Sequence, residues 1–116
     1  MSYQRGEVIS MVYHPASTGR RRVTKLRPMV VISSDDYHKE RPQDIIVALV
    51  TSKVAKYQGV TDYALRDWQA AGLHQPSTVR CTFATIELSQ IDGKIGKLTA
   101  FDVQRLENVL KNALAL

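Results

Sequence analysis

The sequence predicts a small, mainly β domain that is closed by one C-terminal helix. Two observations support this prediction: short apolar runs separated by turn residues recur along most of the chain, and apolar residues recur at helical spacing near its C-terminus. About five short strands followed by one helix fit a strongly bent sheet or barrel on which the helix packs. The chain of 116 residues has the usual length of one domain, and we expect residues 1–116 to form it.

The first three predicted strands are separated by proline-containing or polar segments. The first spans Glu7–Tyr13 and ends at His14-Pro15, because proline cannot donate a hydrogen bond to a neighbouring strand. The next two, residues 28–33 and 45–50, are apolar runs of the kind that lies buried on both faces of a sheet. Residues 34–36 read Ser-Asp-Asp, which predicts a turn or a helix cap between them.

The middle of the chain predicts a short strand and then a turn. Residues 60–65 are expected to pair with another strand after a polar segment. Asp67 is expected to cap a single helical turn, and Gly72 to close it in the left-handed conformation that glycine adopts readily.

Residues 78–83 predict a further strand, in which Cys81 and the residues two positions away on either side share one face. Cys81 is expected to be a buried core residue on that face. Ile86 continues the apolar pattern on the opposite parity, which predicts a bulge near residues 84–85.

The C-terminal segment predicts the one long helix. Thr99 followed by Asp102 resembles a capping box, with aspartate in place of the usual glutamate. An apolar stripe at helical spacing follows. It consists of Val103, Leu106, Val109, Leu110, Ala113 and Leu114.

Composition and charge favour a soluble protein with a polyanionic partner. Hydrophobic residues make up 44% and charged residues 23%, as in ordinary globular proteins, and no run is long enough to span a membrane. The formal net charge is +5, and five cations lie within eight positions, which raises affinity for phosphates. They are Arg20, Arg21, Arg22, Lys25 and Arg27. A solvated loop that keeps the protein soluble is the alternative interpretation of this cluster.

The single cysteine allows no internal disulfide, so the reducing cytoplasm is the expected compartment. With no second cysteine and three scattered histidines, neither a metal site nor a cofactor site is predicted. The N-terminal residues lack the continuous apolar stretch of a signal peptide.

Polar groups at the ends of two apolar strands predict a phosphodiester site. Arg27 precedes residues 28–33, while Thr51 and Ser52 directly follow residues 45–50. A rigid strand end can hold a guanidinium or a hydroxyl in a defined position, as precise chemistry requires.

Several segments, taken in order, resemble the MazF/PemK family of toxins. They are Arg5-Gly6-Glu7-Val8, Arg27-Pro28-Met29-Val30-Val31-Ile32-Ser33, Val50-Thr51-Ser52 and Ile95-Gly96-Lys97-Leu98. Three more resemble a PemK-like branch: Asp67-Trp68-Gln69-Ala70-Ala71-Gly72-Leu73, Gln75-Pro76-Ser77 and Val79-Arg80. The resemblance covers nearly the whole chain, and it is the ordered set that is specific.

This resemblance implies an SH3-like barrel with a C-terminal helix, assembled as a homodimer. It further implies a metal-independent endoribonuclease that cuts single-stranded RNA without a cofactor. The ribose 2′-hydroxyl attacks the adjacent phosphate and leaves a 2′,3′-cyclic phosphate and a 5′-hydroxyl end. The implied protein partner is a small antitoxin with an acidic, disordered tail.

The resemblance also assigns roles to residues. Arg27 would stabilise charge on the phosphoryl group, and the hydroxyl of Thr51 would orient it. Arg80 would stabilise the same charge or assist the leaving oxygen. Thr82 is a departure, because the family has a carboxylate there as a proposed general base, which a threonine cannot replace near neutral pH. His14 is a candidate substitute, although its place before proline also fits a turn residue. The expected RNA-binding residues are Arg20, Arg21, Arg22, Lys25, Ser52 and Thr82.

Two alternatives use the same fold without RNA cleavage. A toxin that resembles CcdB would bind a protein target, DNA gyrase. The missing carboxylate at Thr82 favours this alternative. A small regulator would bind nucleic acid without cutting it. Arg27 and Thr51 favour the ribonuclease over both.

Overall fold

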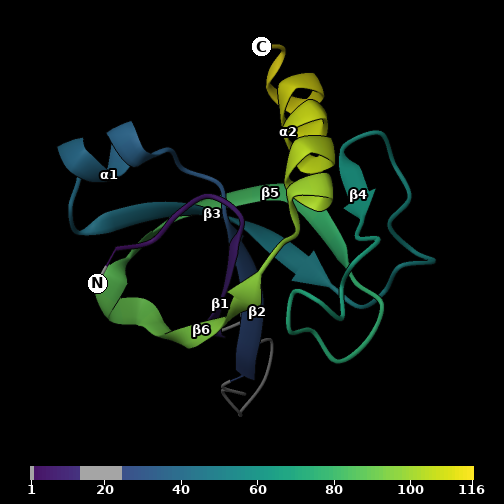
Figure 1. Cartoon of the computed structure of the whole chain (residues 1–116), viewed down its shortest axis with the longest axis horizontal. Coiled ribbons are helices and arrows are strands. Elements are labelled where there is room, and N and C mark those ends of the chain that lie inside the picture. The colour runs from purple at the N-terminus through teal and green to yellow at the C-terminus, as the bar shows by residue number, and fades with distance from the viewer. Residues whose placement is uncertain (1, 14–24) are drawn as a thin grey trace, which may run out of the picture.

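The computed structural model describes residues 2–13 and 25–116, in which six antiparallel strands form one sheet. The strands are β1 (Glu7–Tyr13), β2 (Lys25–Val31), β3 (Asp44–Thr51), β4 (Asp62–Ala64), β5 (Thr78–Glu87) and β6 (Ile91–Lys97). The helices are α1 (Asp35–Glu40), the short 3-10 turn η1 (Leu88–Gln90) and α2 (Ala100–Leu114). The sheet order is β4-β5-β3-β2-β1-β6, and the sheet bends strongly, with α2 beside β4 and β5 (Figure 1).

The predicted fold class, a mainly β domain with a C-terminal helix, is confirmed. The sheet is bent but not closed into a barrel, because β4 and β6 are its edges and do not pair with each other in the described sheet. The sixth strand, β6, was not predicted from the sequence. Gly93 and Gly96 interrupt it and leave no apolar run, and glycine is unfavourable inside a strand, so its pairing with β1 is a product of the tertiary structure.

Two hydrophobic clusters cover opposite faces of the central strands. Strand β3 contributes to both, because successive side chains of a strand point to opposite faces. Ala48 and Val50 belong to the first cluster, which α2 covers, whereas Ile45 and Val47 belong to the second, with Tyr3 of the N-terminal segment. The apolar run of β3 is therefore buried on both faces, as its sequence predicts.

Strand β5 contains a bulge, but three residues before the predicted position. Ala48 of β3 pairs with Phe83, while Leu49 pairs with Arg80, so Cys81 and Thr82 have no partner on β3. Two extra residues preserve the alternation of side chains along a strand. The predicted switch of parity near residues 84–85 is wrong: Ile86 lies on the same face as Arg80, and the second cluster buries it there.

Residues 67–73 form the predicted single helical turn, which is too short to count as a helix. The amide of Ala71 donates to the carbonyl of Asp67 at 3.2 Å, and Gly72 adopts a φ of 86°, as expected for the closing glycine. The carboxylate of Asp67 does not cap this turn. It accepts hydrogen bonds from the side chains of Arg66 and Thr99 instead.

Helix caps follow the sequence signals. The Ser34 hydroxyl accepts from the amide of Tyr37 and starts α1, and the Thr99 hydroxyl accepts from the amide of Asp102 and starts α2. In the predicted stripe of α2, Leu106 and Leu110 are buried in the first cluster, but Leu114 is half exposed at the C-terminal end of the helix. Among the helices that the structure describes, none is long and apolar enough to cross a membrane.

Candidate functional site

The structure brings Arg27, Thr51 and Arg80 together in one cleft. The cleft has a volume of about 190 Å³, and Leu49, Lys53 and Tyr57 complete its lining. Arg27 lies on β2, Thr51 on β3 and Arg80 on β5, which are three successive strands of the sheet. We refer to it below as the arginine cleft.

Strand register explains why these side chains meet. Met29 of β2 pairs with Leu49 of β3, and continuing this antiparallel register by two residues places Arg27 opposite Thr51. Leu49 in turn pairs with Arg80 of β5. Because paired residues share one face of a sheet, all five side chains point to the same side.

The cleft is cationic, and its lining suits an anion. Arg27, Lys53 and Arg80 line it, and no acidic side chain does among its described lining residues. Guanidinium groups donate paired hydrogen bonds to phosphate oxygens. Residues 2–13 and 25–116 contain no group of three His, Cys, Asp or Glu side chains that could hold a metal ion.

Thr51 presents its hydroxyl at the end of β3. Its Oγ1 accepts a hydrogen bond from the amide of Lys53 at 3.1 Å, and the residue is 9% exposed. A hydroxyl donates one proton and accepts through two lone pairs, so this local contact leaves the proton for a ligand oxygen. The same hydroxyl can thus end the strand and contact a phosphate.

Arg80 is held from two sides. Its guanidinium carbon lies 3.8 Å from the ring centroid of Tyr57, a stacked cation–π contact. Its Nε lies 3.6 Å from Oδ1 of Asp62, which is also its pairing partner on β4. Oδ2 of the same carboxylate accepts a hydrogen bond from the amide of Gly59 at 3.0 Å.

A second hollow adjoins the arginine cleft and shares Arg27 with it. It has a volume of about 390 Å³, and Ser52 lines it, so two of the predicted residues belong to it. Apolar groups such as Leu73 form part of its wall, and polar side chains, His74 and Gln75 among them, form the rest. An apolar wall with a few hydrogen-bonding groups is the usual lining of a small-molecule or nucleobase site.

Among the remaining predicted site residues, Thr82 is the one whose side chain the structure describes. Thr82 is exposed in the β5 bulge and lines neither. Lys25 begins β2, and only its backbone is described. His14, Arg20, Arg21 and Arg22 lie outside the described residues.

Sequence reasoning missed Lys53, Tyr57 and Asp62. The first two follow β3 in a polar segment without a regular pattern, and the third begins the short strand β4. Asp62 falls within the predicted strand 60–65, but only the β4–β5 register shows that it faces Arg80. No signal in the sequence gives that register.

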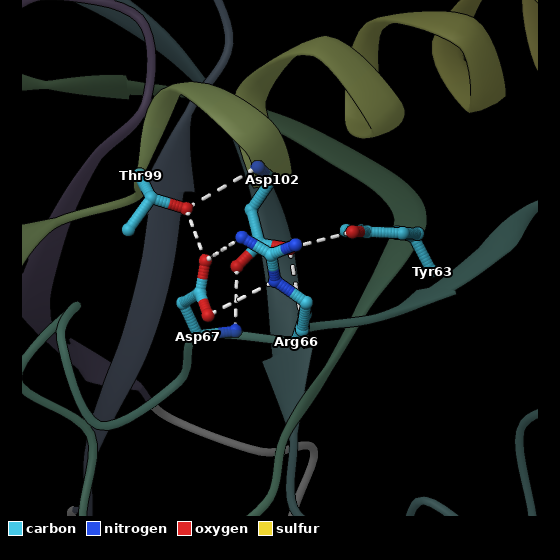
Figure 2. Close-up of polar contacts among 5 residues, drawn as sticks. All are labelled: Tyr63, Arg66, Asp67, Thr99 and Asp102. Atoms are coloured by element: carbon cyan, nitrogen blue, oxygen red, sulfur yellow. Dashed lines mark hydrogen bonds and ion pairs between the residues drawn. The ribbon is translucent and has the colours of Figure 1, made fainter.

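A buried carboxylate anchors the turn beside β4. Asp102 is fully buried; its Oδ1 accepts from the Tyr63 hydroxyl at 2.5 Å and from the amide of Arg66 at 3.1 Å, and its Oδ2 accepts from the amide of Asp67 at 2.9 Å. Figure 2 shows these contacts, with Thr99 joining the same network. Burial, and secondly the hydrogen bond to Asp102, raise the pKa of the Tyr63 phenol well above its usual value.

Cys81 is partly buried against the first cluster, behind the cleft. Burial raises the pKa of its thiol, and the negative charge of Asp62 raises it further. The thiol is therefore protonated near neutral pH.

Comparisons with known proteins identify the family. Residues 4–114 match the model of the PemK-like, MazF-like toxins of type II toxin–antitoxin systems. No curated protein matches the chain.

Solved structures share the fold. An endoribonuclease from a mycobacterial species, determined in complex with its cognate antitoxin, superposes with a TM-score of 0.74 over 99% of this chain and 97% of its own, at 16% identity. The Mycobacterium tuberculosis toxin MazF-mt6 gives 0.69 over 93% and 97%, at 23% identity. A MazE–MazF structure from Deinococcus radiodurans gives 0.73 over 98% and 97%, at 14% identity. With a family match over nearly its whole length and this fold, the chain belongs to the PemK-like, MazF-like toxins of type II toxin–antitoxin systems.

Proposed function

We propose that this toxin is a metal-independent endoribonuclease that cleaves single-stranded RNA in the cytoplasm. One observation carries the proposal: Arg27, Thr51 and Arg80, which lie far apart in the sequence, converge on a single cationic cleft. Structural relatives include endoribonucleases, which supports the same reaction class. The cleft supplies the groups that stabilise a phosphoryl transition state.

In the proposed reaction the 2′-hydroxyl oxygen bonds to phosphorus and loses its proton to a base. The bond from phosphorus to the 5′ oxygen breaks, and that oxygen gains a proton. The products are a 2′,3′-cyclic phosphate and a 5′-hydroxyl end. Negative charge grows on the non-bridging oxygens during this step, and fixed donors aimed at that charge lower the barrier.

Four residues of the arginine cleft act in this step. The guanidinium groups of Arg27 and Arg80 donate to the non-bridging oxygens. The Thr51 hydroxyl, whose oxygen is fixed by the Lys53 amide, donates its proton to one of them and orients the phosphate for in-line attack. Lys53 adds long-range attraction for the RNA backbone.

The hollow beside Arg27 would hold a nucleotide next to the scissile phosphate. Because this hollow and the arginine cleft share Arg27, a base bound in the hollow would lie near the scissile phosphate. His74 and Gln75 offer hydrogen bonds to base edges, while Leu73 offers apolar contact. RNA sequence is read in this way on unstacked bases.

We propose an acidic antitoxin as the partner that blocks this site. The net charge of +5 and the cationic cleft favour a negatively charged occupant. Relatives of the same fold have been solved with their antitoxins. Competitive inhibition of RNA cleavage by a polyglutamate peptide, weakening as salt rises, is the expected behaviour. The resemblance to the family implies a homodimer, which light scattering on the purified protein tests.

The decisive experiment is digestion of diverse RNAs by the purified protein in excess EDTA, with the product ends mapped. EDTA-resistant cuts that leave 5′-hydroxyl ends are expected. Arg27→Ala should lower the rate by about 100-fold or more, as for removal of one oxyanion donor. Arg105→Ala is the matched control, because it also removes one positive charge but lies on α2, away from the cleft.

Two outcomes would contradict the proposal. Cleavage that Arg27→Ala leaves at the wild-type rate would mean that the arginine cleft is not the active site. Salt-dependent RNA binding by folded protein without any new ends would indicate a binding protein instead.

A further inference from the structure

Two side chains of the described residues support Arg80 in the arginine cleft. Tyr57 stacks on its guanidinium, and Asp62 lies beside its Nε. We propose that Asp62 and Tyr57 are positioning residues that hold the Arg80 guanidinium toward the scissile phosphate. We call the contacts of Asp62 and Tyr57 with the Arg80 guanidinium the clamp. The catalytic role of the clamp rests on the proposed ribonuclease function, but its existence as a physical arrangement can be tested separately.

Asp62 is placed to act on Arg80 because it is itself fixed. The two residues pair across β4 and β5, so their side chains share one face of the sheet. The Asp62 side chain is 14% exposed and that of Arg80 30% exposed, which limits screening of the ion pair by water. Oδ2 of Asp62 is already bonded to the amide of Gly59, which leaves Oδ1 facing the guanidinium.

The distance between Arg80 Nε and Asp62 Oδ1 indicates which contact would change when RNA binds. Arg80 Nε is buried and makes no hydrogen bond to the described residues, and 3.6 Å to Asp62 Oδ1 is an ion-pair distance, too long for a hydrogen bond. Contacts to a catalytic group often shorten when a substrate is bound. A small movement of Arg80 toward Asp62 would satisfy this buried donor and turn the terminal nitrogens of the guanidinium toward a phosphate.

Tyr57 fixes the plane of the same guanidinium. The separation of 3.8 Å corresponds to stacking on the ring face, and it leaves the edge of the guanidinium, where the N–H donors lie, free of the ring. Tyr57 also lines the arginine cleft, so it forms the wall against which Arg80 rests. The ring of Tyr57 restrains tilting of the Arg80 guanidinium, and the carboxylate of Asp62 restrains its rotation.

The anchor of β4 keeps Asp62 in place. Its neighbour Tyr63 points the other way and donates to the buried carboxylate of Asp102 in α2. Successive side chains of a strand face opposite sides, so fixing Tyr63 also fixes Asp62. The charge of Asp62 also affects a second residue of β5, because it contributes to the raised pKa of Cys81.

The clamp also bears on the departure at Thr82. The family resemblance implies a carboxylate at position 82, on the same strand as Arg80, whereas this chain has a threonine there, exposed in the bulge. In this chain the negative charge next to Arg80 comes from the adjacent strand, through Asp62.

The first test does not require activity. In ¹⁵N-labelled protein, the Nε–H resonance of Arg80 is assigned by its absence in Arg80→Lys. Asp62→Asn keeps an oxygen for the Gly59 amide but removes the charge, and it should broaden or shift this resonance. Tyr57→Leu should move it by removing the ring current, whereas Tyr57→Phe keeps the ring. An Arg80 resonance unchanged in both Asp62→Asn and Tyr57→Leu overturns the clamp.

The second test measures kcat and KM on an RNA oligonucleotide. Asp62→Asn and Tyr57→Leu should lower kcat by about 10- to 100-fold with a smaller change in KM, because a misplaced catalytic group mainly affects the chemical step. Asp62→Glu and Tyr57→Phe should recover most of the lost rate. Asp92→Asn, an exposed carboxylate on β6, controls for the change in net charge.

The two tests separate the inference from the proposed function. If the wild type cleaves RNA and Asp62→Asn and Tyr57→Leu retain the full kcat, the positioning role is overturned while the ribonuclease stands. If the wild type cleaves nothing but the Arg80 resonance responds as described, the proposed function fails and the clamp on Arg80 is supported.

Discussion

The hydroxyl of Tyr63 donates a 2.5 Å hydrogen bond to Oδ1 of Asp102, and this contact joins β4 to the first turn of α2. The two residues are 39 positions apart. The same carboxylate accepts two backbone amides from the turn that follows β4. One buried side chain therefore fixes the edge strand, the turn and the start of the helix relative to one another (Figure 2).

Tyr63→Phe should lower the free energy of unfolding by about 2 kcal/mol, the usual cost of losing a hydrogen bond to a charged group. The ring remains, so packing against the first cluster is kept. Tyr37→Phe is the matched control, because the Tyr37 hydroxyl makes no hydrogen bond to the described residues. Urea unfolding of the three proteins gives the comparison. Equal losses in both variants would show that the Asp102 contact adds no stability.

Asp67→Asn should reduce the sensitivity of the protein to acid. Hydrogen bonds, first from Arg66 and then from Thr99, lower the pKa of the Asp67 carboxyl. Because the folded-state pKa is below that of the unfolded chain, about 3.9, the stabilisation is fully present above that value. It is lost as the pH falls through the lower folded-state value.

The measurement for Asp67 is Tm at neutral pH and at about pH 3. Wild type should lose more Tm between the two than Asp67→Asn, while Asp92→Asn should behave as the wild type. An identical loss in all three would rule out a contribution from Asp67.

Cys81 should react slowly with iodoacetamide in the folded protein, because burial and the nearby Asp62 raise the pKa of its thiol. The rate should reach half its maximum above about pH 8.5, the value for a free cysteine. Asp62→Asn removes the smaller of the two causes, so the midpoint should fall toward the free value without reaching it. An unchanged pH midpoint in Asp62→Asn would show that the Asp62 charge does not affect the pKa of Cys81.

Gly96→Ala should destabilise the protein, since a Cβ at this position would lie 2.2 Å from the carbonyl oxygen of Ala71. The atoms that this Cβ would meet, in Ala71 and Gly72, belong to the backbone, so relief requires a shift of β6 or of the turn, at about 1–3 kcal/mol. Gly93→Ala on the same strand is the control, because a Cβ there meets nothing within 4 Å. Thermal melts of both variants test the contrast, and a Gly96→Ala protein as stable as Gly93→Ala would refute it.

Thr51→Val keeps the branched shape of the side chain but removes the hydroxyl, and it should lower kcat for RNA cleavage by about 10- to 100-fold through loss of phosphate orientation. Thr51→Ser keeps the hydroxyl and should retain more of the rate. Single-turnover cleavage with mapped ends distinguishes them. Similar activity in both would assign Thr51 to ending the strand alone.

Much of the fold could be predicted because local sequence patterns, such as apolar runs and helix-cap residues, determine it. The apolar run of β3 is buried on both faces, and the caps at Ser34 and Thr99 start the two α-helices. The bulge was misplaced because burial of Ile86 depends on a second cluster that involves the distant N-terminal segment. Strand β6 was missed because its pairing, not its composition, makes it a strand.

The site was predictable to the extent that its residues lie in recognisable segments. Arg27, Thr51 and Arg80 were found in this way, and the structure places them in one cleft. Their supports, Asp62 and Tyr57, could not be found, because cross-strand register and the path of an irregular segment depend on contacts distant in sequence.

The position of the arginine cleft across β2, β3 and β5 has a consequence for how the proposed activity would be lost. These strands are central in the sheet, so their backbone amides are expected to exchange with solvent through opening of the whole structure. The three residues cannot separate while that centre is intact. Complete loss of the proposed activity on heating should therefore coincide with global unfolding, whereas earlier fraying of β4, the outer strand that carries Asp62, would only lower the rate.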